Sequence, residues 1–446
     1  MKILLVNPPR SPHNGILEHA APDVTPFIHR KLIGPPLGLL TIAGAVPDHE
    51  VRLLELKAEY DLRPAAPPPA VLVRRAVEET APDVVGVTVI TSELGSSLEI
   101  LEEVKRIAPN AVTVAGGLHP TLAPGDFTGT AADVVCPGPA TKPFAELVRA
   151  IEQGSRLAEV RGVWLDTGGG LAFTGARLEE IDEAGRDLVL PRRDLVAPWM
   201  ASYKVGSSPD PATYVFTSLG CPHRCTFCSI WPQHGGAYRK RDVASVVTEL
   251  GSLDDYPVVR FADANTVVDV DWAGRLFDAI AAAGIDKFFI MDMRVDTAAR
   301  NPRLVEKMAR GGLKVVIAGF ESFRDTELEK YAKSTEKRQI DEAIRVFHEN
   351  GIMLRGNYVV PPDYGADDFA ALAEYAGTHR VTYAGYTILT PMPGTAYHAE
   401  VADRIVDRDP AKYNFFNCVL PTRLPLDEFY SRVADLWAIK KGTEVI

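Results

Sequence analysis

Residues 214–231 read YVFTSLGCPHRCTFCSIW and place three cysteines on one loop directly after an apolar, β-branched run. Their spacing is Cys221-x3-Cys225-x2-Cys228. Three thiolates can bind three irons of a cubane cluster and leave the fourth iron without a protein ligand. A catalytic metal site needs such an open coordination position. The stretch therefore predicts a 4Fe–4S cluster in a catalytic role.

Two other metal sites fit three clustered cysteines. A zinc site would need a fourth ligand from His223 or His234, although neither has a standard zinc spacing. A structural or electron-transfer cluster would ordinarily use a fourth cysteine, and none follows nearby. The remaining cysteines, Cys136 and Cys418, stand alone and are interpreted as buried core thiols. Because this odd set is a poor disulfide framework, we expect a reducing, cytoplasmic location.

The cysteine loop belongs to a series of alternating strand and helix patterns. Short apolar runs predict strands at 213–218, 257–262, 286–292, 314–320, 353–360 and 382–390. Apolar periodicity predicts helices at 242–252, 271–283, 301–311, 335–350 and 365–377. This succession predicts an open, partial (β/α)6 barrel, related to the eight-stranded barrel, with its chemistry at the carboxyl ends of the strands.

A separate α/β series precedes the barrel. Strand patterns at 2–6, 51–56, 84–90 and 111–116 alternate with helical patterns at 37–46, 70–80 and 95–108. The alternation predicts a doubly wound, Rossmann-like sheet that binds ligands at the carboxyl ends of its strands. We expect this domain at 1–155, a hairpin and linker at 156–200, the barrel at 201–400 and a helical extension at 401–446.

The composition excludes several classes of partner. The chain has 446 residues, 46% of them hydrophobic and 24% charged, with a net charge of −11. A negative surface argues against a nucleic-acid partner, because phosphate binding needs concentrated basic residues. No apolar run reaches the ~20 residues of a membrane-spanning helix, so no membrane partner is expected. The start, MKILLVNPPR, is typical of a first strand and not of a signal peptide.

The cysteine loop also carries a family resemblance. With a strand before its first cysteine and Phe227 before its last, it resembles the loop of the radical S-adenosylmethionine (SAM) superfamily. LLVNPP at 4–9, GPPLGLLTIAGAV at 34–46 and AGGLHPTLAP at 115–124 resemble the cobalamin-binding domain of one large branch. The resemblance implies that the open iron chelates SAM. It also implies that SAM cleavage gives a 5′-deoxyadenosyl radical, which takes a hydrogen atom from the substrate.

Polar residues at the mouths of the barrel strands acquire roles from this resemblance. Family members contact the SAM amino group after the second strand, where FADANT places Asp263 and Asn265. After the third strand, Arg294 would pair with the SAM carboxylate and Asp292 would reach a ribose or substrate hydroxyl. The other cofactor-binding candidates at the same mouth are Phe227, Ser322, Arg355 and Asn357.

Two short stretches narrow the expected reaction. CSIWPQHGGAYRKR at 228–241 and VLPTRLPLDEFY at 419–430 resemble a radical SAM subgroup that acts on sugars, including diol dehydratases of aminoglycoside biosynthesis. The resemblance implies radical 1,2-diol dehydration of paromamine or a similar amino sugar, a small-molecule substrate. Reduction of the product radical implies an external reductant or a reductase partner.

Dehydration needs a base and an acid near the substrate. Glu321, at the mouth of the fourth strand, is the expected base, and Lys204 or Tyr214 is the expected proton donor. Asp263 and Asp292, together with Glu321, would bind the ammonium groups of an amino sugar.

Cobalamin distinguishes this reaction from its main alternative, a cobalamin-dependent radical SAM methyltransferase acting on an unactivated carbon. The Asp-x-His-x-x-Gly pattern of many cobalamin proteins is absent, and His119 stands in GGLHPT instead. Where the branch commonly shows Gly-Glu-Gly-Glu, this chain has Pro137-Gly138-Pro139-Ala140. Both departures count against bound cobalamin and so favour dehydration. A non-catalytic iron–sulfur module is a third interpretation, which the polar strand mouths disfavour.

Overall fold

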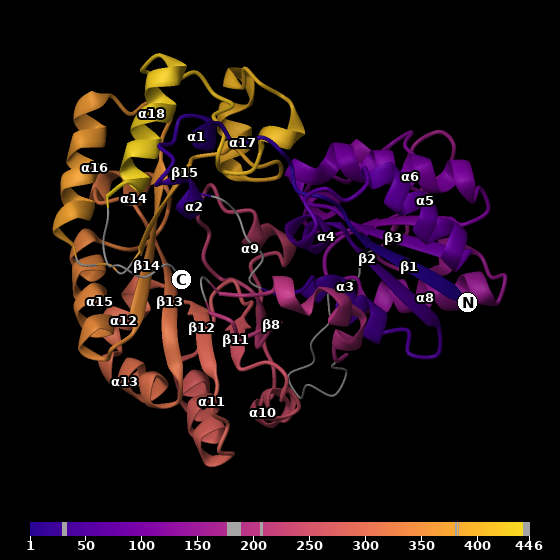
Figure 1. The fold of residues 1–446 in the computed structure, drawn as a ribbon, viewed down its shortest axis with the longest axis horizontal. Coiled ribbons are helices and arrows are strands. Elements are labelled where there is room, and N and C mark those ends of the chain that lie inside the picture. The colour runs from indigo at the N-terminus through magenta and orange to yellow at the C-terminus, as the bar shows by residue number, and fades with distance from the viewer. Residues whose placement is uncertain (29–33, 176–188, 206–207, 380, 382, 440–446) are drawn as a thin grey trace. The chain divides into compact units, whose positions relative to one another are not determined.

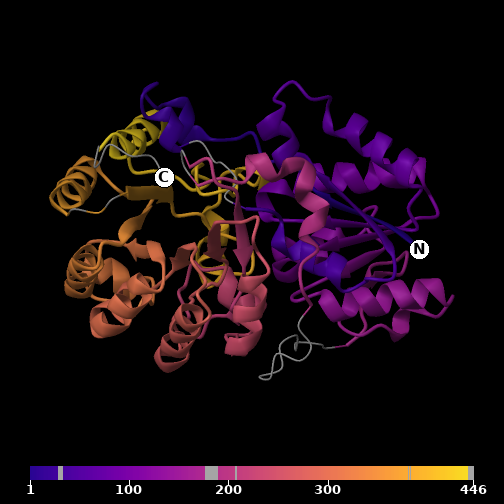
Figure 2. The same cartoon turned by 60° about the horizontal axis from the view of Figure 1, so that its bottom comes forward.

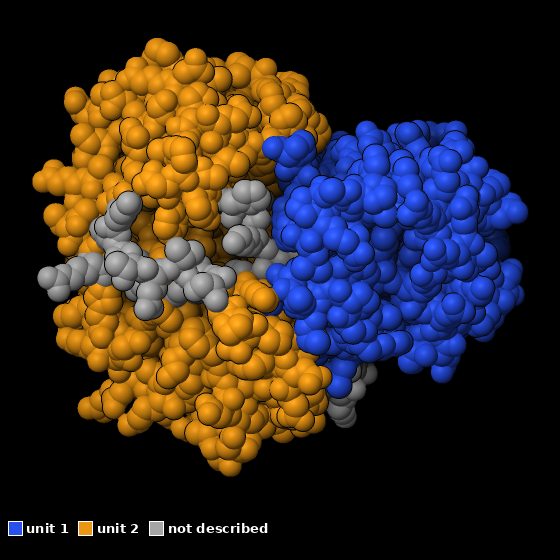
Figure 3. Space-filling view, in the orientation of Figure 1, with its two compact units in different colours: residues 1–12, 32–203, 232–234 blue, residues 13–31, 204–231, 235–446 orange. Residues whose placement is uncertain are grey.

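The computed structural model describes residues 1–28, 34–175, 189–205, 208–379, 381 and 383–439. Contacts divide the chain into two compact units (Figures 1 and 3). Unit 1 comprises Met1–Pro12, Leu32–Tyr203 and Pro232–His234. Unit 2 comprises His13–Lys31, Lys204–Trp231 and Gly235–Ile446.

Unit 1 is built on a seven-stranded sheet with the order β2-β1-β3-β4-β5-β6-β7. Its strands are β1 (Lys2–Asn7), β2 (Glu50–Glu55), β3 (Val84–Thr88), β4 (Val112–Gly116), β5 (Val134–Cys136), β6 (Trp164–Asp166) and β7 (Leu171–Phe173). The first five are parallel, whereas β6 and β7 form an antiparallel hairpin around the glycines at 168–170, as predicted. The order of β1 to β5 is the flavodoxin-like doubly wound arrangement.

Both faces of this sheet are buried, which explains why its strands are apolar throughout. In β1, Leu4 and Val6 join one core cluster, and Ile3 and Leu5 join the other. Alternate residues of a strand point to opposite faces, so both faces need covering helices. The helices are α3 (Leu37–Gly44), α4 (Leu56–Leu62), α5 (Pro69–Thr80), α6 (Leu94–Ile107), α7 (Leu118–Leu122) and α8 (Thr141–Glu152).

Unit 2 is built on six parallel strands in the order β8-β11-β12-β13-β14-β15. They are β8 (Ala212–Val215), β11 (Val258–Phe261), β12 (Phe288–Asp292), β13 (Leu313–Glu321), β14 (Met353–Val360) and β15 (Tyr383–Ile388). The predicted fold class, a Rossmann-like domain followed by a partial (β/α)6 barrel, is confirmed. Residue 382, where the sixth predicted strand begins, lies outside the described residues.

Helices lie along the outside of this curved row of strands (Figures 1 and 2). They are α10 (Val243–Gly251), α11 (Val270–Ala282), α12 (Val295–Arg300), α13 (Pro302–Arg310), α14 (Asp325–Lys330), α15 (Lys337–Glu349) and α16 (Ala366–Thr378). Phe261 of β11 stacks on Phe289 of β12 with 5.2 Å between ring centroids, and Phe277 of α11 meets both rings edge-on. These rings mark the helix-facing side, so alternate residues of the strands face the barrel interior.

Other elements complete unit 2. A short antiparallel pair, β9 (Ser218–Gly220) and β10 (Tyr238–Lys240), flanks the cysteine loop and was not predicted. The remaining helices are α1 (Gly15–Glu18), α2 (Thr25–Ile28), α9 (Ile230–Gln233), α17 (Ala396–Val401) and α18 (Leu426–Trp437). The C-terminal helix α18 packs on the barrel, where Trp437 donates from Nε1 to the carbonyl of Tyr386 at 3.1 Å.

One predicted region contains an unexpected element, and parts of two regions lie outside the described residues. The predicted linker after the hairpin contains a 3₁₀ segment, Arg193–Ser202. Residues 176–188 of that region and 440–446 of the C-terminal extension lie outside the described residues. None of the helices in the described ranges combines the length and apolar character that crossing a bilayer requires.

Candidate active site

The three cysteines lie on the loop that follows β9. Cys225 is buried and Cys221 and Cys228 are half-buried, and all three thiols are free. The Cys228 amide donates to the Cys225 carbonyl at 3.2 Å, which closes a turn between them. Trp231 Nε1 also donates to the Cys225 carbonyl, at 3.0 Å. The loop therefore has a defined path without any disulfide.

The chemistry of this loop fits an iron–sulfur cluster. The amide of Ile230 donates to Cys228 Sγ at 3.4 Å, a contact that stabilises a thiolate and tunes a cluster. Burial raises the pKa of Cys225, while Lys333 and Arg294 oppose the shift. Within the described ranges, no three His, Cys, Asp or Glu side chains form a set that could hold one metal ion. The fit to a cluster thus rests on three free thiols carried by one loop, on nearby cations and on an amide donor.

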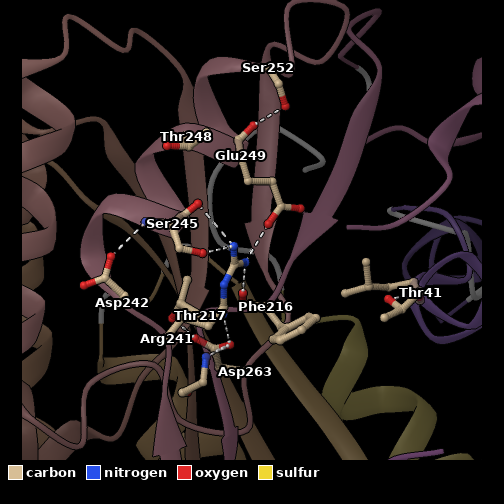
Figure 4. Close-up of polar contacts among 12 residues, drawn as sticks. Thr41, Phe216, Thr217, Arg241, Asp242, Ser245, Thr248, Glu249, Ser252 and Asp263 are labelled. Carbon is tan, nitrogen blue, oxygen red and sulfur yellow. Dashed lines mark hydrogen bonds and ion pairs between the residues drawn. The ribbon is translucent and has the colours of Figure 1, made fainter. Parts of the chain in front are cut away.

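A double clamp fixes the segment between β8 and the loop (Figure 4). Asp263, just after β11, accepts from the Thr217 and Ser218 amides at 2.6 and 2.9 Å and from the Thr217 hydroxyl. Burial raises the pKa of Asp263 to about 6 against these hydrogen bonds. Arg241, after β10, donates to the Phe216 carbonyl at 2.8 Å, and its amide donates to the Thr217 carbonyl. The carboxylate of Asp263 is therefore already used by the protein backbone.

Glu249 of α10 neutralises Arg241. The guanidinium donates to Glu249 Oε2 at 2.5 Å, and side-chain exposures are 0% and 3%. Ser245, one turn earlier on α10, accepts at its hydroxyl and its carbonyl, 3.0 and 3.3 Å from Nη2. Asp242 caps α10 by accepting from the Ser245 amide at 3.1 Å, so the helix that carries the carboxylate starts at a fixed place.

A second buried ion pair lies beside the cysteines. Lys333 Nζ donates to Glu321 Oε1 at 2.6 Å. Arg294 donates to the Lys333 carbonyl at 2.5 Å and to Asp296 Oδ1 at 2.8 Å. Glu321 has a left-handed backbone, with φ +62°, at the irregular end of β13. Glu321 and Arg294, two predicted site residues, are thus brought together with Lys333, which the sequence reasoning missed.

The inward face of the barrel gathers four further predicted residues. Asp292 accepts from Arg260 Nη2 at 2.7 Å, and the Arg260 guanidinium lies 5.9 Å from the ring centre of Tyr214. Two strands along, Arg355 Nε lies 3.4 Å from Asn357 Oδ1. Arg260 was missed, although a charged residue inside the apolar run VVRF was a usable signal.

The remaining predicted residues have distinct surroundings. Asn265 is 2% exposed, and within the described structure neither its Oδ1 nor its Nδ2 has a hydrogen-bond partner. Ser322 donates to Glu327 Oε2 at 2.5 Å, and Phe227 packs edge-on against Tyr331 at 5.5 Å. The backbone of half-buried Lys204 pairs with Pro211. Asn265 therefore has the free polar atoms expected of a ligand-binding residue.

Known proteins share this architecture. The chain matches the B12 binding domain family over residues 25–148 and the radical SAM superfamily over residues 215–376. It is 30% identical over 405 residues to an uncharacterized methyltransferase of Pyrococcus horikoshii. The alignment covers 89% of this chain and 82% of that relative. The chain belongs to the radical SAM superfamily. As a radical SAM protein with a B12 binding domain, it has the architecture that the sequence predicted.

Other relatives of this radical SAM protein are similar over most of its length. Hopanoid C-3 methylase of Methylococcus capsulatus is 26% identical, over 89% of this chain and 75% of the methylase. The methyltransferase TsrM of Kitasatospora setae, solved with cobalamin and a 4Fe–4S cluster, superposes with a TM-score of 0.73. At 20% identity over 98% of this chain and 91% of TsrM, that likeness shows the fold alone.

These comparisons correct the predicted reaction. Dehydration of an amino sugar is wrong as the main interpretation, because several relatives are named as methyltransferases or a methylase and none of these relatives is named as a dehydratase. They support the alternative, methyl transfer. The doubt about cobalamin is countered by the B12 binding domain match. The carboxylates expected to bind ammonium groups have other partners: Asp292 binds Arg260, Glu321 binds Lys333, and Asp263 binds backbone amides.

In unit 1 of this radical SAM protein, cobalamin would be expected at the carboxyl ends of the strands. After β4, Gly117 has φ +111°, and a Cβ there would meet the Val89 carbonyl at 2.9 Å, so only glycine permits this turn. Both ring nitrogens of buried His119 are used, by Thr91 at 3.2 Å and by Asp126 at 3.0 Å. The carboxyl edge of the sheet therefore fits a ligand that contacts the backbone at Gly117. His119 is not free to bind the metal of that ligand, because both of its ring nitrogens have partners.

The Pro137–Ala140 stretch forms a turn of its own. Gly138 has φ +65°, and its amide donates to Thr121 Oγ1 at 2.7 Å. The turn is thereby tied to α7, the short helix that follows Gly117. The hydrogen bond to Thr121 therefore holds this segment in place, although it lacks the two acidic residues of the Gly-Glu-Gly-Glu pattern.

Proposed function

We propose that this protein is a cobalamin-dependent radical SAM methyltransferase that acts on an unactivated carbon of a small molecule. The observation that carries the proposal is one chain that joins a B12 binding domain to the radical SAM cysteine loop. The names of its relatives support methyl transfer as the reaction class.

In this proposal Cys221, Cys225 and Cys228 hold the cluster, and the carboxyl edge of the unit 1 sheet holds cobalamin. When bound, the cluster and SAM supply a hydrogen-abstracting radical, and cobalamin supplies the methyl group. The clamp formed by Asp263 and Arg241 holds the backbone that leads into the cysteine loop. Asn265 supplies an unpaired carbonyl and amide to SAM. The Lys333–Glu321 pair keeps a fixed charge arrangement beside Cys225.

The test is anaerobic reconstitution with iron, sulfide and hydroxocobalamin, followed by reduction and addition of SAM. We expect about one cobalamin and four irons per chain, with S-adenosylhomocysteine and 5′-deoxyadenosine as products. Protein that retains no cobalamin and forms no S-adenosylhomocysteine would contradict methyl transfer.

A matched variant separates the two cofactors. Cys225→Ala removes a proposed cluster ligand in unit 2 and leaves unit 1 unchanged, so we expect retained cobalamin and no 5′-deoxyadenosine. Cys418→Ala is the control, because Cys418 is a buried thiol outside the Cys221–Cys228 loop sequence, and its Sγ donates to the Leu420 carbonyl at 3.3 Å. SAM cleavage by Cys225→Ala at the native rate would refute the cluster assignment.

A further inference from the structure

Two positive charges and one negative charge lie close together on the inward face of the barrel. Strand register places Asp292 of β12 beside Ile317 of β13, and Ile317 beside Arg355 of β14. Arg260 of β11 reaches the same region and binds Asp292. Two guanidinium groups therefore share the neighbourhood of one carboxylate, and that carboxylate is 2.7 Å from Arg260.

Of these two guanidinium groups, Arg355 is the one to which the described residues supply no ion pair. Among the described residues its only hydrogen bond is the long contact from Nε to Asn357 Oδ1 at 3.4 Å. Burial and the charge of Arg260 lower the pKa of Arg355, and Asp292 only partly opposes this shift. Leaving a buried charge unpaired is unfavourable unless a ligand or water compensates it. Arg355 as a whole residue is half-buried, so part of its surface stays accessible although its charged group is largely buried.

The neighbouring strands carry glycine at this point. Gly385 of β15 pairs with Asn357, and a Cβ at Gly385 would lie 2.5 Å from Asn357 Oδ1 and 3.4 Å from Arg355 Nη2. Gly319 of β13 pairs with Asn357 from the other side. Both strand neighbours of Asn357 therefore lack side chains. The Asn357 and Arg355 side chains fill the space beside Gly385, and Glu321 and Lys333 fill the space beside Gly319.

We propose that the substrate is an anion whose carboxylate or phosphate group binds Arg355 and Asn357 inside the barrel. This inference rests on the proposed function and adds the class of substrate to it. The planar guanidinium offers parallel N–H donors that match carboxylate and phosphate oxygens. The Asn357 amide adds a neutral donor next to it. An amino sugar bearing only ammonium groups would meet repulsion here, because the local carboxylate is already paired.

SAM itself carries a carboxylate, which is the other anion available to Arg355. The two sources predict different results. If Arg355 binds the substrate, its removal weakens anion binding and leaves SAM binding unchanged. If Arg355 binds SAM, its removal weakens SAM binding and leaves the binding of phosphate or acetate unchanged.

The experiment measures binding of inorganic phosphate, and separately of acetate, to reconstituted protein saturated with SAM, by isothermal titration calorimetry. Putrescine serves as the cationic probe. We expect one phosphate or acetate site per chain and no putrescine binding. Arg355→Gln should weaken anion binding about tenfold or more, the effect of losing a charged hydrogen-bond donor. Arg345→Gln, which removes an exposed guanidinium from α15, should change it less than about twofold.

Other outcomes overturn the inference. Absence of phosphate and acetate binding to the native protein does so, as does equal binding by Arg355→Gln. A loss of SAM affinity with unchanged anion binding assigns Arg355 to SAM and also refutes it. Should Arg355→Gln fail to fold, Asn357→Ala supplies the second variant, with an expected loss of about fivefold for a neutral hydrogen bond. Cobalamin retention and S-adenosylhomocysteine are measured on the same preparation, so failure of methyl transfer is seen separately.

Discussion

The Arg241–Glu249 pair offers a quantitative test of how the cysteine loop is held. Arg241→Met leaves the Glu249 carboxylate, which is 3% exposed, without its cation. Breaking a buried ion pair in this way typically costs about 3–5 kcal/mol of folding free energy. Glu249→Leu leaves Arg241 unpaired and should cost a similar amount. The double variant removes both charges and leaves mainly the Phe216 carbonyl unsatisfied, which costs about 1–3 kcal/mol.

The coupling energy follows from these values. The two single losses exceed the loss in the double variant by at least about 3 kcal/mol, which is the interaction energy of the pair. Urea unfolding of the apoprotein measures it through tryptophan emission and far-UV circular dichroism. Trp272 is a local reporter, since it is 3% exposed and its Nε1 donates to the Arg241 carbonyl at 2.9 Å. A coupling energy below about 1 kcal/mol would show that the pair does not act as a unit.

The same variant tests positioning. With Arg241 lost, the Phe216 carbonyl is released, but Asp263 still holds Thr217 and Ser218. We therefore expect Arg241→Met to retain iron and to release 5′-deoxyadenosine more slowly, with Asp263→Asn losing both. An Arg241→Met protein with a native rate of SAM cleavage would mean that this half of the clamp supports folding alone.

Two further predictions follow from single buried side chains. Asn265→Ala should weaken SAM binding about tenfold without loss of stability, because the removed amide has no partner among the described residues; unchanged SAM affinity in a binding titration would contradict its assignment. Burial raises the pKa of Glu55 to about 7, so the folded state keeps a proton that the unfolded state has lost. Stability should therefore fall as pH rises from about 4.5 to about 7, by roughly 3 kcal/mol at most. Glu55→Gln should remove that slope in urea titrations at pH 5 to 8, and an identical slope in both proteins would count against Glu55.

The sequence predicted what depends on local pattern. The Cys221–Cys228 spacing and the alternation of apolar strands and helices are properties of neighbouring residues, and most strands of both sheets follow from them. The three-residue strand β5 (Val134–Cys136) was not predicted. The β9–β10 pair was missed because Ser218–Gly220 and Tyr238–Lys240 are short and lack a strong apolar alternation. Their pairing depends on tertiary contacts across the cysteine loop.

The partners of charged residues could not be predicted from the sequence. Asp292 looked available for an ammonium group, yet it binds Arg260 from a neighbouring strand. Glu321 looked available as a base, yet Lys333, twelve residues later in the sequence, is its partner. The sequence shows which strand ends carry charged residues. Only the folded structure shows which of these charges are neutralised by a partner. For this reason the sequence favoured a cationic substrate, and the arrangement of side chains favours an anionic one.

The region around Lys333 shows where local rules give way to the site. Among the described residues, five non-glycine residues have positive φ, and three of them, Glu321, Ala332 and Ser334, bracket the Lys333–Glu321 ion pair. Each such residue typically costs about 1–3 kcal/mol and persists only when surrounding contacts impose it. Here the imposed arrangement brings the Lys333 charge close enough to oppose the rise in the Cys225 pKa. Sequence rules would place glycine at these three positions. Backbone strain is thus concentrated beside Cys225, a proposed cluster ligand. This indicates that the local structure is determined by the position of Lys333 more than by the stability of residues 332–334.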